Sequence, residues 1–279
     1  MNYNLTIEQY KQLISQPEYQ MVQYPWVGYE EFEQLSSYGN LAHLFEELTE
    51  QLGRVPTQTE YINEGLARSK AFFIGKAKPN GDRWLPIQKD KNGKVLKWHN
   101  FKWDERLEKA IVQRIARSYP SHMVEYSTIL LLKSYFPQYK IGANDYLDGV
   151  MGVDIVVGSE QHDKVAYIHI TSASSYSDHW LKKKEDRKGV IYQNGVRHEY
   201  TRNFKKGHIH LSFSLYESES TEIINSIPLL KISHIQQVLE TAFMLAPYMD
   251  TWKKKEQLCQ LHHWLKDKGI EQGLGSVWL

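Results

Sequence analysis

The sequence predicts an α/β protein with a mixed β-sheet flanked by helices, preceded by a helical and β-hairpin region. Three observations predict this class: helical spacing of apolar residues, short apolar runs of strand length after Pro137, and Asn-Gly pairs between short strand-like runs. The chain has 279 residues, of which 41% are hydrophobic and 24% charged. This composition supports a sizeable core and excludes global disorder.

The first part of the chain is predicted to be helical. Apolar residues at i, i+3, i+4 spacing predict one or two helices between residues 29 and 53. A shorter helix is expected between residues 6 and 16. Thr57 followed by Glu60 is a capping-box pattern, which predicts a helix running to about Gly65.

Residues 72–103 have the pattern of a basic β-hairpin. Asn92-Gly93 is typical of a tight turn and lies inside the basic run 87–98, and Trp84, Trp98, Phe101 and Trp103 interleave with its lysines. Basic residues interleaved with aromatic ones suit nucleic-acid contact, but the aromatic side chains can equally be buried in a small β-layer. The candidates for nucleic-acid contact are Lys89, Lys91, Lys94, Lys97 and Trp98.

The rest of the chain is predicted to alternate helices and strands. Pro120 is expected to separate two helices, 104–118 and 121–135, because proline lacks the backbone N–H that a helix interior needs. Strands are predicted at 139–141, 153–157, 165–171, 208–215 and 227–232, a hairpin at 190–200, and helices at 177–187, 233–246 and 251–268. We expect an N-terminal region over 1–104, with a possible recognition role, and an α/β core with C-terminal helices over 105–279.

Between residues 121 and 215 the predicted order is helix, β-hairpin, strand, helix, strand. Asp154 opens one strand, and His169-x-Thr171 follows on the next strand after 14 intervening residues. This arrangement resembles the PD-(D/E)XK nuclease superfamily, which has the restriction-endonuclease-like fold. The resemblance implies a restriction-like DNA endonuclease that hydrolyses phosphodiesters with Mg²⁺ or Mn²⁺.

The resemblance also implies roles for individual residues. Glu125 and Asp154 would bind the metal, His169 would be a metal ligand or a general base, and Thr171 would position water or phosphate. The sequence departs from the superfamily pattern, because His169 stands where Glu, Asp or Gln is usual and Thr171 stands where Lys is usual. Magnesium prefers oxygen ligands, so the imidazole is a poor substitute. A lysine of the following predicted helix would replace the missing one: Lys182, Lys183 or Lys184.

A second set of histidines lies on a neighbouring predicted strand. His208 and His210 alternate, so they share one face and would gather near His169 if the two strands are adjacent. Three imidazoles would suit zinc better than magnesium. The other interpretation is that they are polar residues on a half-exposed strand, and the pattern alone leaves both open.

Charge is distributed unevenly along the chain. Residues 1–51 contain one Lys or Arg against eight Glu, whereas residues 68–106 contain eleven Lys or Arg against four Asp or Glu. Residues 181–208 contain nine against three. Basic segments are typical of polyanion-binding surfaces and also of ordinary solvated faces. The candidates for phosphate contact in the last segment are Arg187, Lys188, Arg197, Arg202, Lys205 and Lys206.

Three functions are consistent with these patterns. The first is the metal-dependent DNA endonuclease, for which a homodimer would be common. The second is a non-catalytic protein on a degenerate nuclease fold, which binds nucleic acid or inhibits a partner protein. The third is an inhibitor whose acidic first 51 residues mimic nucleic acid. A single cysteine, Cys259, no secretory signal and no apolar run of membrane-spanning length lead us to expect a cytoplasmic protein without a membrane segment.

Overall fold

A computed structural model shows a mixed α/β protein, which confirms the predicted class. The structure describes residues 5–35, 41, 44–75, 77–78, 81–90, 94–143, 154–159, 164–172, 188–193, 196–201, 208–213 and 220–245. The chain divides into two compact units, residues 1–2 with 15–122, and residues 3–14 with 123–279. The division falls inside a long helix, α5 (Glu105–Tyr135), whereas the sequence prediction drew its boundary before that helix.

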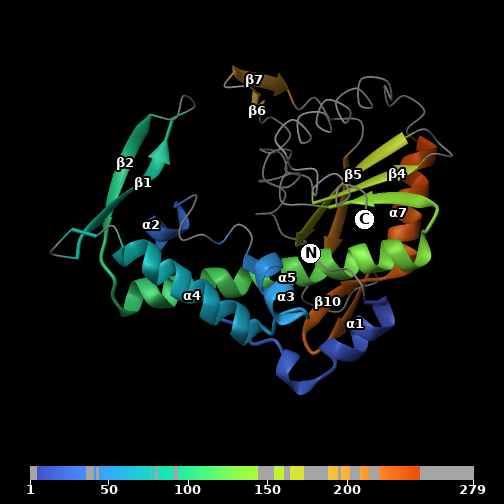
Figure 1. The fold of residues 1–279 in the computed structure, drawn as a ribbon, viewed down its shortest axis with the longest axis horizontal. Helices are drawn as coiled ribbons and strands as arrows, with labels where there is room; N and C mark the ends of the chain where they lie inside the picture. Colours follow the sequence, from blue (N-terminus) through green and yellow to red (C-terminus); the bar gives the residue numbers. More distant parts are fainter. Residues whose placement is uncertain are drawn as a thin grey trace. The chain divides into compact units, whose positions relative to one another are not determined.

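The first unit combines helices with one β-hairpin (Figure 1). Its helical elements before α5 are η1 (Pro17–Tyr19), α2 (Glu30–Glu33), α3 (Leu44–Leu52) and α4 (Gln58–Ile74), and its strands are β1 (Arg83–Lys89) and β2 (Val95–Phe101). A Cβ atom at Gly65 would lie 2.9 Å from Cδ1 of Ile115 and 3.0 Å from Cδ2 of Leu44. Glycine therefore lets α4 pack closely against α3 and α5.

The predicted capping box begins α4. The Glu60 amide donates to Thr57 Oγ1 at 3.3 Å, and the Thr57 amide donates to Glu60 Oε2 at 2.8 Å. Arg54 adds a bidentate ion pair to the same carboxylate, with N–O distances of 2.7 and 3.0 Å. The helix runs to Ile74, well past the predicted end near Gly65, because packing of its buried face continues beyond that glycine.

The prediction that Pro120 ends a helix is wrong. α5 continues through this residue to Tyr135, although proline cannot donate the usual backbone hydrogen bond. Side chains on both sides of the proline are buried, including Ile115 at 2% exposure and Met123 at 0%. The Tyr119 hydroxyl also donates to the Pro56 carbonyl at 2.9 Å. Burial of both halves of the helix outweighs the lost hydrogen bond.

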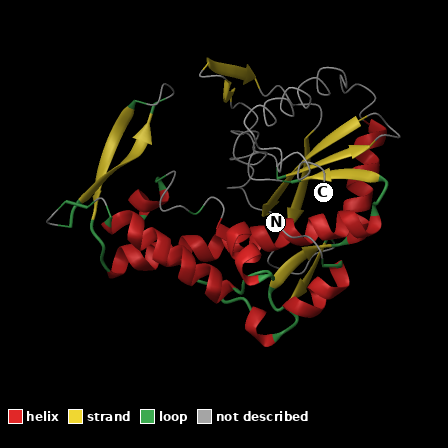
Figure 2. Cartoon of the chain, viewed as in Figure 1, coloured by secondary structure: helices red, strands yellow, loops and turns green. Residues whose placement is uncertain are grey.

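The second unit is built around a four-stranded sheet (Figure 2). Its order is β3 (Tyr139–Gly142), β4 (Ile155–Ser159), β5 (Lys164–Ser172) and β8 (His208–Phe213). The first three strands are antiparallel, and β8 lies parallel to β5. The remaining elements are α1 (Ile7–Ile14), two hairpins, β6 (Lys188–Gln193) with β7 (Val196–Thr201) and β9 (Thr221–Ile224) with β10 (Ile227–Leu230), and α7 (Ile232–Leu245).

These strands confirm the predicted positions, with ends that differ by a few residues. β9 was not predicted. It pairs with β10, and the two strands are connected by Asn225 and Ser226, which both have positive φ. The predicted helices at 177–187 and 251–268 lie outside the described residues. Among the helices that the structure describes, none combines the length and the apolar character needed to cross a bilayer.

The Arg54–Glu60 pair should make the first unit sensitive to acid. Hydrogen bonds from Arg54 are the main cause that lowers the pKa of Glu60 from 4.5 to about 2. A carboxylate with a depressed pKa stabilises the folded state fully above its ordinary pKa and loses that effect as the pH falls toward 2. Glu60→Gln should therefore lower the free energy of unfolding at pH 7, and the difference from wild type should shrink at pH 3, as measured by urea unfolding.

Glu30→Gln is the matched control, because Glu30 is exposed on α2 and forms no ion pair within the described residues. It should leave the unfolding free energy near the wild-type value at both pH values. An effect of Glu60→Gln that is equally large at pH 7 and pH 3 would contradict an electrostatic role of the pair.

Candidate functional site

Asp154 precedes β4 directly and holds the end of β4 against β5. Its amide donates to the Ile168 carbonyl at 3.1 Å, and the Ile170 amide donates to its carboxylate Oδ2 at 2.6 Å. The described backbone pairing of β4 with β5 runs from Ile155–Ile168 to Ser159–Lys164, so the Ile170 amide lies beyond it and is bonded by this carboxylate. The Asp154 carboxylate is thus fixed beside the β5 segment that contains His169 and Thr171.

His169 is buried, although it was expected to bind the metal and so to lie close to a DNA phosphate. Its exposure is 2%, against 0% for Ile168 on the opposite face of the strand. The physical reason is that β5 is an interior strand, between β4 and β8, and that α7 packs on β5 and β8. Thr171 is half-buried. A group this deeply covered is poorly placed to meet a DNA phosphate directly.

The parallel register of β5 and β8 places His169 opposite His210 and Thr171 opposite Ser212. His208 is opposite Tyr167 and not His169. The backbone pairing therefore brings two of the three predicted histidines to neighbouring positions. The side chains of His208 and His210 lie outside the described part of the structure.

Glu125 lies on α5, half-buried between the buried residues Val124 and Tyr126. Where side chains are described, no three His, Cys, Asp or Glu residues are close enough together to hold a metal ion. The expected trio of Glu125, Asp154 and His169 is therefore not assembled as a metal site. Asp154 supplies the oxygen chemistry that magnesium prefers, but His169 and Thr171 do not complete it, so these residues alone do not fit the ion.

Several predicted residues fall outside the described part of the chain. They are Lys91, Lys182, Lys183, Lys184, Arg187, Arg202, Lys205 and Lys206. Lys188 begins β6 and Arg197 lies in β7, and the two strands pair as the predicted hairpin, but their side chains are not described.

The β1–β2 hairpin of the first unit has one face packed into the protein. Arg83 and Phe101 are opposite each other in the register and are 7% and 1% exposed. The Arg83 guanidinium carbon lies 3.8 Å from the ring centroid of Phe72, and Phe101 packs against Phe73 with 5.8 Å between ring centroids. Burial lowers the pKa of Arg83. The sequence alone did not reveal this anchor, because placing Arg83 and Phe101 on one face requires the register that pairs the two strands.

The opposite face of the hairpin is exposed. Trp84 is opposite Asn100 and Pro86 is opposite Trp98, so these four residues share the outer face. Trp84 is 51% exposed and Trp98 is 53% exposed. Three lysines of the same hairpin are also exposed: Lys89, Lys94 and Lys97. Burial in a β-layer is thus correct for Phe101 on the inner face, whereas Trp84 and Trp98 on the outer face are about half exposed and available for contact with a ligand.

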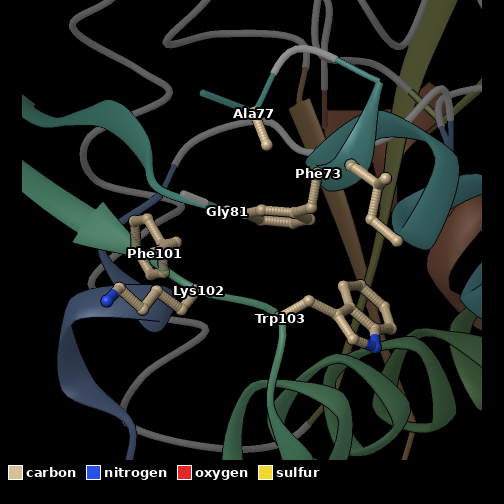
Figure 3. Close-up of a pocket in the computed structure, with 7 residues that line it drawn as sticks. Phe73, Ala77, Gly81, Phe101, Lys102 and Trp103 are labelled. Atoms are coloured by element: carbon tan, nitrogen blue, oxygen red, sulfur yellow. The ribbon is translucent and has the colours of Figure 1, made fainter. Parts of the chain in front are cut away.

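A small pocket lies at the base of the hairpin, within the first unit (Figure 3). Its volume is about 220 Å³, and its lining residues are Phe73, Ile74, Ala77, Gly81, Phe101, Lys102 and Trp103. Lys102 is paired with Asp82 at 3.2 Å. The volume is below the roughly 300–1,000 Å³ typical of small-molecule sites. We therefore assign no ligand to it.

Comparisons of this chain with protein-family models, with curated proteins and with solved structures found no match.

Two substitutions of Asp154 should separate its structural and chemical contributions. Asp154→Ala leaves the part-buried Ile170 amide without its carboxylate acceptor and should lower the free energy of unfolding by about 1–3 kcal/mol. Asp154→Asn keeps an oxygen at the same place and should recover most of that loss. Thermal or urea unfolding measures both, and equal stability of the two variants would contradict the role of this hydrogen bond.

Proposed function

We propose that this protein binds DNA through the β1–β2 hairpin. The observation that carries the proposal is that this hairpin exposes two tryptophans, Trp84 and Trp98, each about half exposed, and three lysines: Lys89, Lys94 and Lys97. Exposed tryptophan in an otherwise packed unit loses the stabilisation that burial would provide. A surface of aromatic residues with surrounding lysines is typical of nucleic-acid-binding proteins.

Charge favours a polyanion at this surface. Lys89, Lys94 and Lys97 form no ion pair within the described residues, so their ammonium groups remain available to phosphate. The nearby acid, Asp90, accepts the Lys94 backbone amide at 2.9 Å inside the turn. Each lysine that contacts a phosphate releases bound counterions, so binding through these residues must weaken steeply with salt.

The test is the salt dependence of binding to a fluorescein-labelled 20-nucleotide DNA, single-stranded or duplex, measured by fluorescence anisotropy. The wild-type protein should bind at low salt, and log K should fall linearly with log salt concentration. Lys89→Ala with Lys97→Ala should weaken binding and make the slope shallower by about 1.4–1.8, because two phosphate contacts are lost.

Lys109→Ala is the control, because Lys109 is exposed on α5 and pairs with Glu105 away from the hairpin. It should leave the slope unchanged. Equal effects of both sets of substitutions would mean that only net charge matters. If no DNA binds at low salt, the proposal fails and a partner-inhibiting protein is favoured instead.

A second candidate function is the metal-dependent DNA endonuclease, with restriction-like hydrolysis of phosphodiesters. It is supported by the order of the second part of α5, three antiparallel strands and the parallel strand β8, which agrees with the predicted order except for the helix at 177–187, which lies outside the described residues. The carboxylate of Asp154 beside β5 is its one described acidic group next to the expected motif. His169 and Thr171 still occupy positions where that superfamily carries other residues.

Incubation of supercoiled plasmid with the protein and Mg²⁺ or Mn²⁺ tests this candidate. If the protein cleaves DNA there, Asp154→Asn should abolish cleavage, because it removes the negative charge while keeping the hydrogen bond to Ile170. Cleavage that survives Asp154→Asn would reject the assignment to Asp154. DNA binding without any cleavage product would reject the endonuclease and support only the DNA-binding function.

A further inference from the structure

The two tryptophans of the outer hairpin face are diagonal neighbours. Trp84 pairs with Asn100, and Trp98 pairs with Pro86, so the two indoles belong to adjacent strands and are offset by two positions. Diagonal side chains on an antiparallel pair are roughly 7–8 Å apart. The two indoles are therefore close neighbours on one face of the hairpin.

Both indoles are available to a ligand. Within the described part of the chain, neither Trp84 nor Trp98 packs against another aromatic ring, and neither is covered by a cation. By contrast, Trp103 at the base of the same hairpin packs against Phe73 and lies under Lys70. The packed inner face of the hairpin keeps Trp84 and Trp98 on the solvent side, because side chains alternate along each strand.

The surrounding charge distinguishes between two kinds of partner. The cores of protein–protein interfaces are depleted in lysine. Here three lysines of the same hairpin are exposed: Lys89 at the end of β1, Lys94 just before β2, and Lys97 in β2. Cationic groups next to open aromatic faces suit a strand whose phosphates and bases are both accessible. Duplex DNA offers its phosphates, but its bases are already stacked on one another.

We propose that Trp84 and Trp98 stack on unpaired bases, and that the protein therefore prefers single-stranded DNA to duplex DNA. The proposal rests on the proposed DNA-binding function and specifies the DNA that the hairpin selects. Lys89, Lys94 and Lys97 contact the phosphates of either form. The two tryptophans add affinity only where bases are unpaired.

The experiment compares a fluorescein-labelled 20-nucleotide oligo-dT with a duplex of equal length, by fluorescence anisotropy at fixed salt. Trp84→Ala and Trp98→Ala should each raise the Kd for oligo-dT by about 5-fold to 100-fold and change the Kd for the duplex by less than about 2-fold. Trp84→Phe and Trp98→Phe should keep most of the oligo-dT affinity, because phenylalanine retains an aromatic face.

Trp26→Ala is the matched control, because Trp26 is 59% exposed in the same unit but lies outside the hairpin. It should leave both Kd values unchanged. Thermal unfolding confirms that each variant is folded, and the phenylalanine variants test the stacking even if an alanine variant is not.

The outcomes separate the two proposals. Binding of both DNAs with equal affinity, unaffected by Trp84→Ala and Trp98→Ala, overturns base stacking while DNA binding stands. A loss in the alanine variants that is equal for oligo-dT and duplex also overturns it, because duplex bases are not available to the indoles. Absence of binding to either DNA at low salt overturns both proposals.

Discussion

The burial of Arg83 and Phe101 against Phe72 and Phe73 is the contact on which the candidate DNA-binding surface depends. A two-stranded hairpin is marginally stable alone, and its two faces are interchangeable until one of them packs on something. Once the inner face is buried, alternation sends Trp84 and Trp98 outward. The guanidinium of Arg83 contributes through its stacking on an aromatic ring, which partly offsets the cost of removing a cation from water.

In the second unit, the Asp154 side chain both makes a structural hydrogen bond and lies beside the expected catalytic strand. Asp154 accepts the Ile170 amide of β5, and the same carboxylate therefore lies beside the strand that carries His169 and Thr171. Structural and chemical uses are compatible in principle, because a carboxylate has two oxygens with several lone pairs. The burial of His169 at 2% exposure works against a direct role for that imidazole in catalysis. The sheet therefore confirms a mixed α/β arrangement, while the endonuclease remains a proposal.

Local rules predicted the elements whose causes lie within a few residues. The capping box of Thr57 and Glu60 is one example, because the two groups that bond each other are three positions apart. The basic hairpin is another, because a tight turn and alternating side chains suffice to pair β1 with β2. The strand positions of the second unit followed from short apolar runs in the same way. Of the candidate site, the sequence pointed to Lys89, Lys94, Lys97 and Trp98, which are exposed, but it left open whether the aromatic side chains are buried.

Tertiary packing decided everything that depends on distant neighbours. The local sequence predicts that a helix ends at Pro120. The helix α5 nevertheless continues, because the side chains before and after Pro120 are buried by segments far away in the chain. The outward direction of Trp84 depends on the burial of Arg83, and the bond between Asp154 and Ile170 joins residues 16 positions apart. The sequence by itself thus determined the elements and their charges, whereas only the folded structure decided which faces are covered, since burial depends on partners that no local pattern specifies.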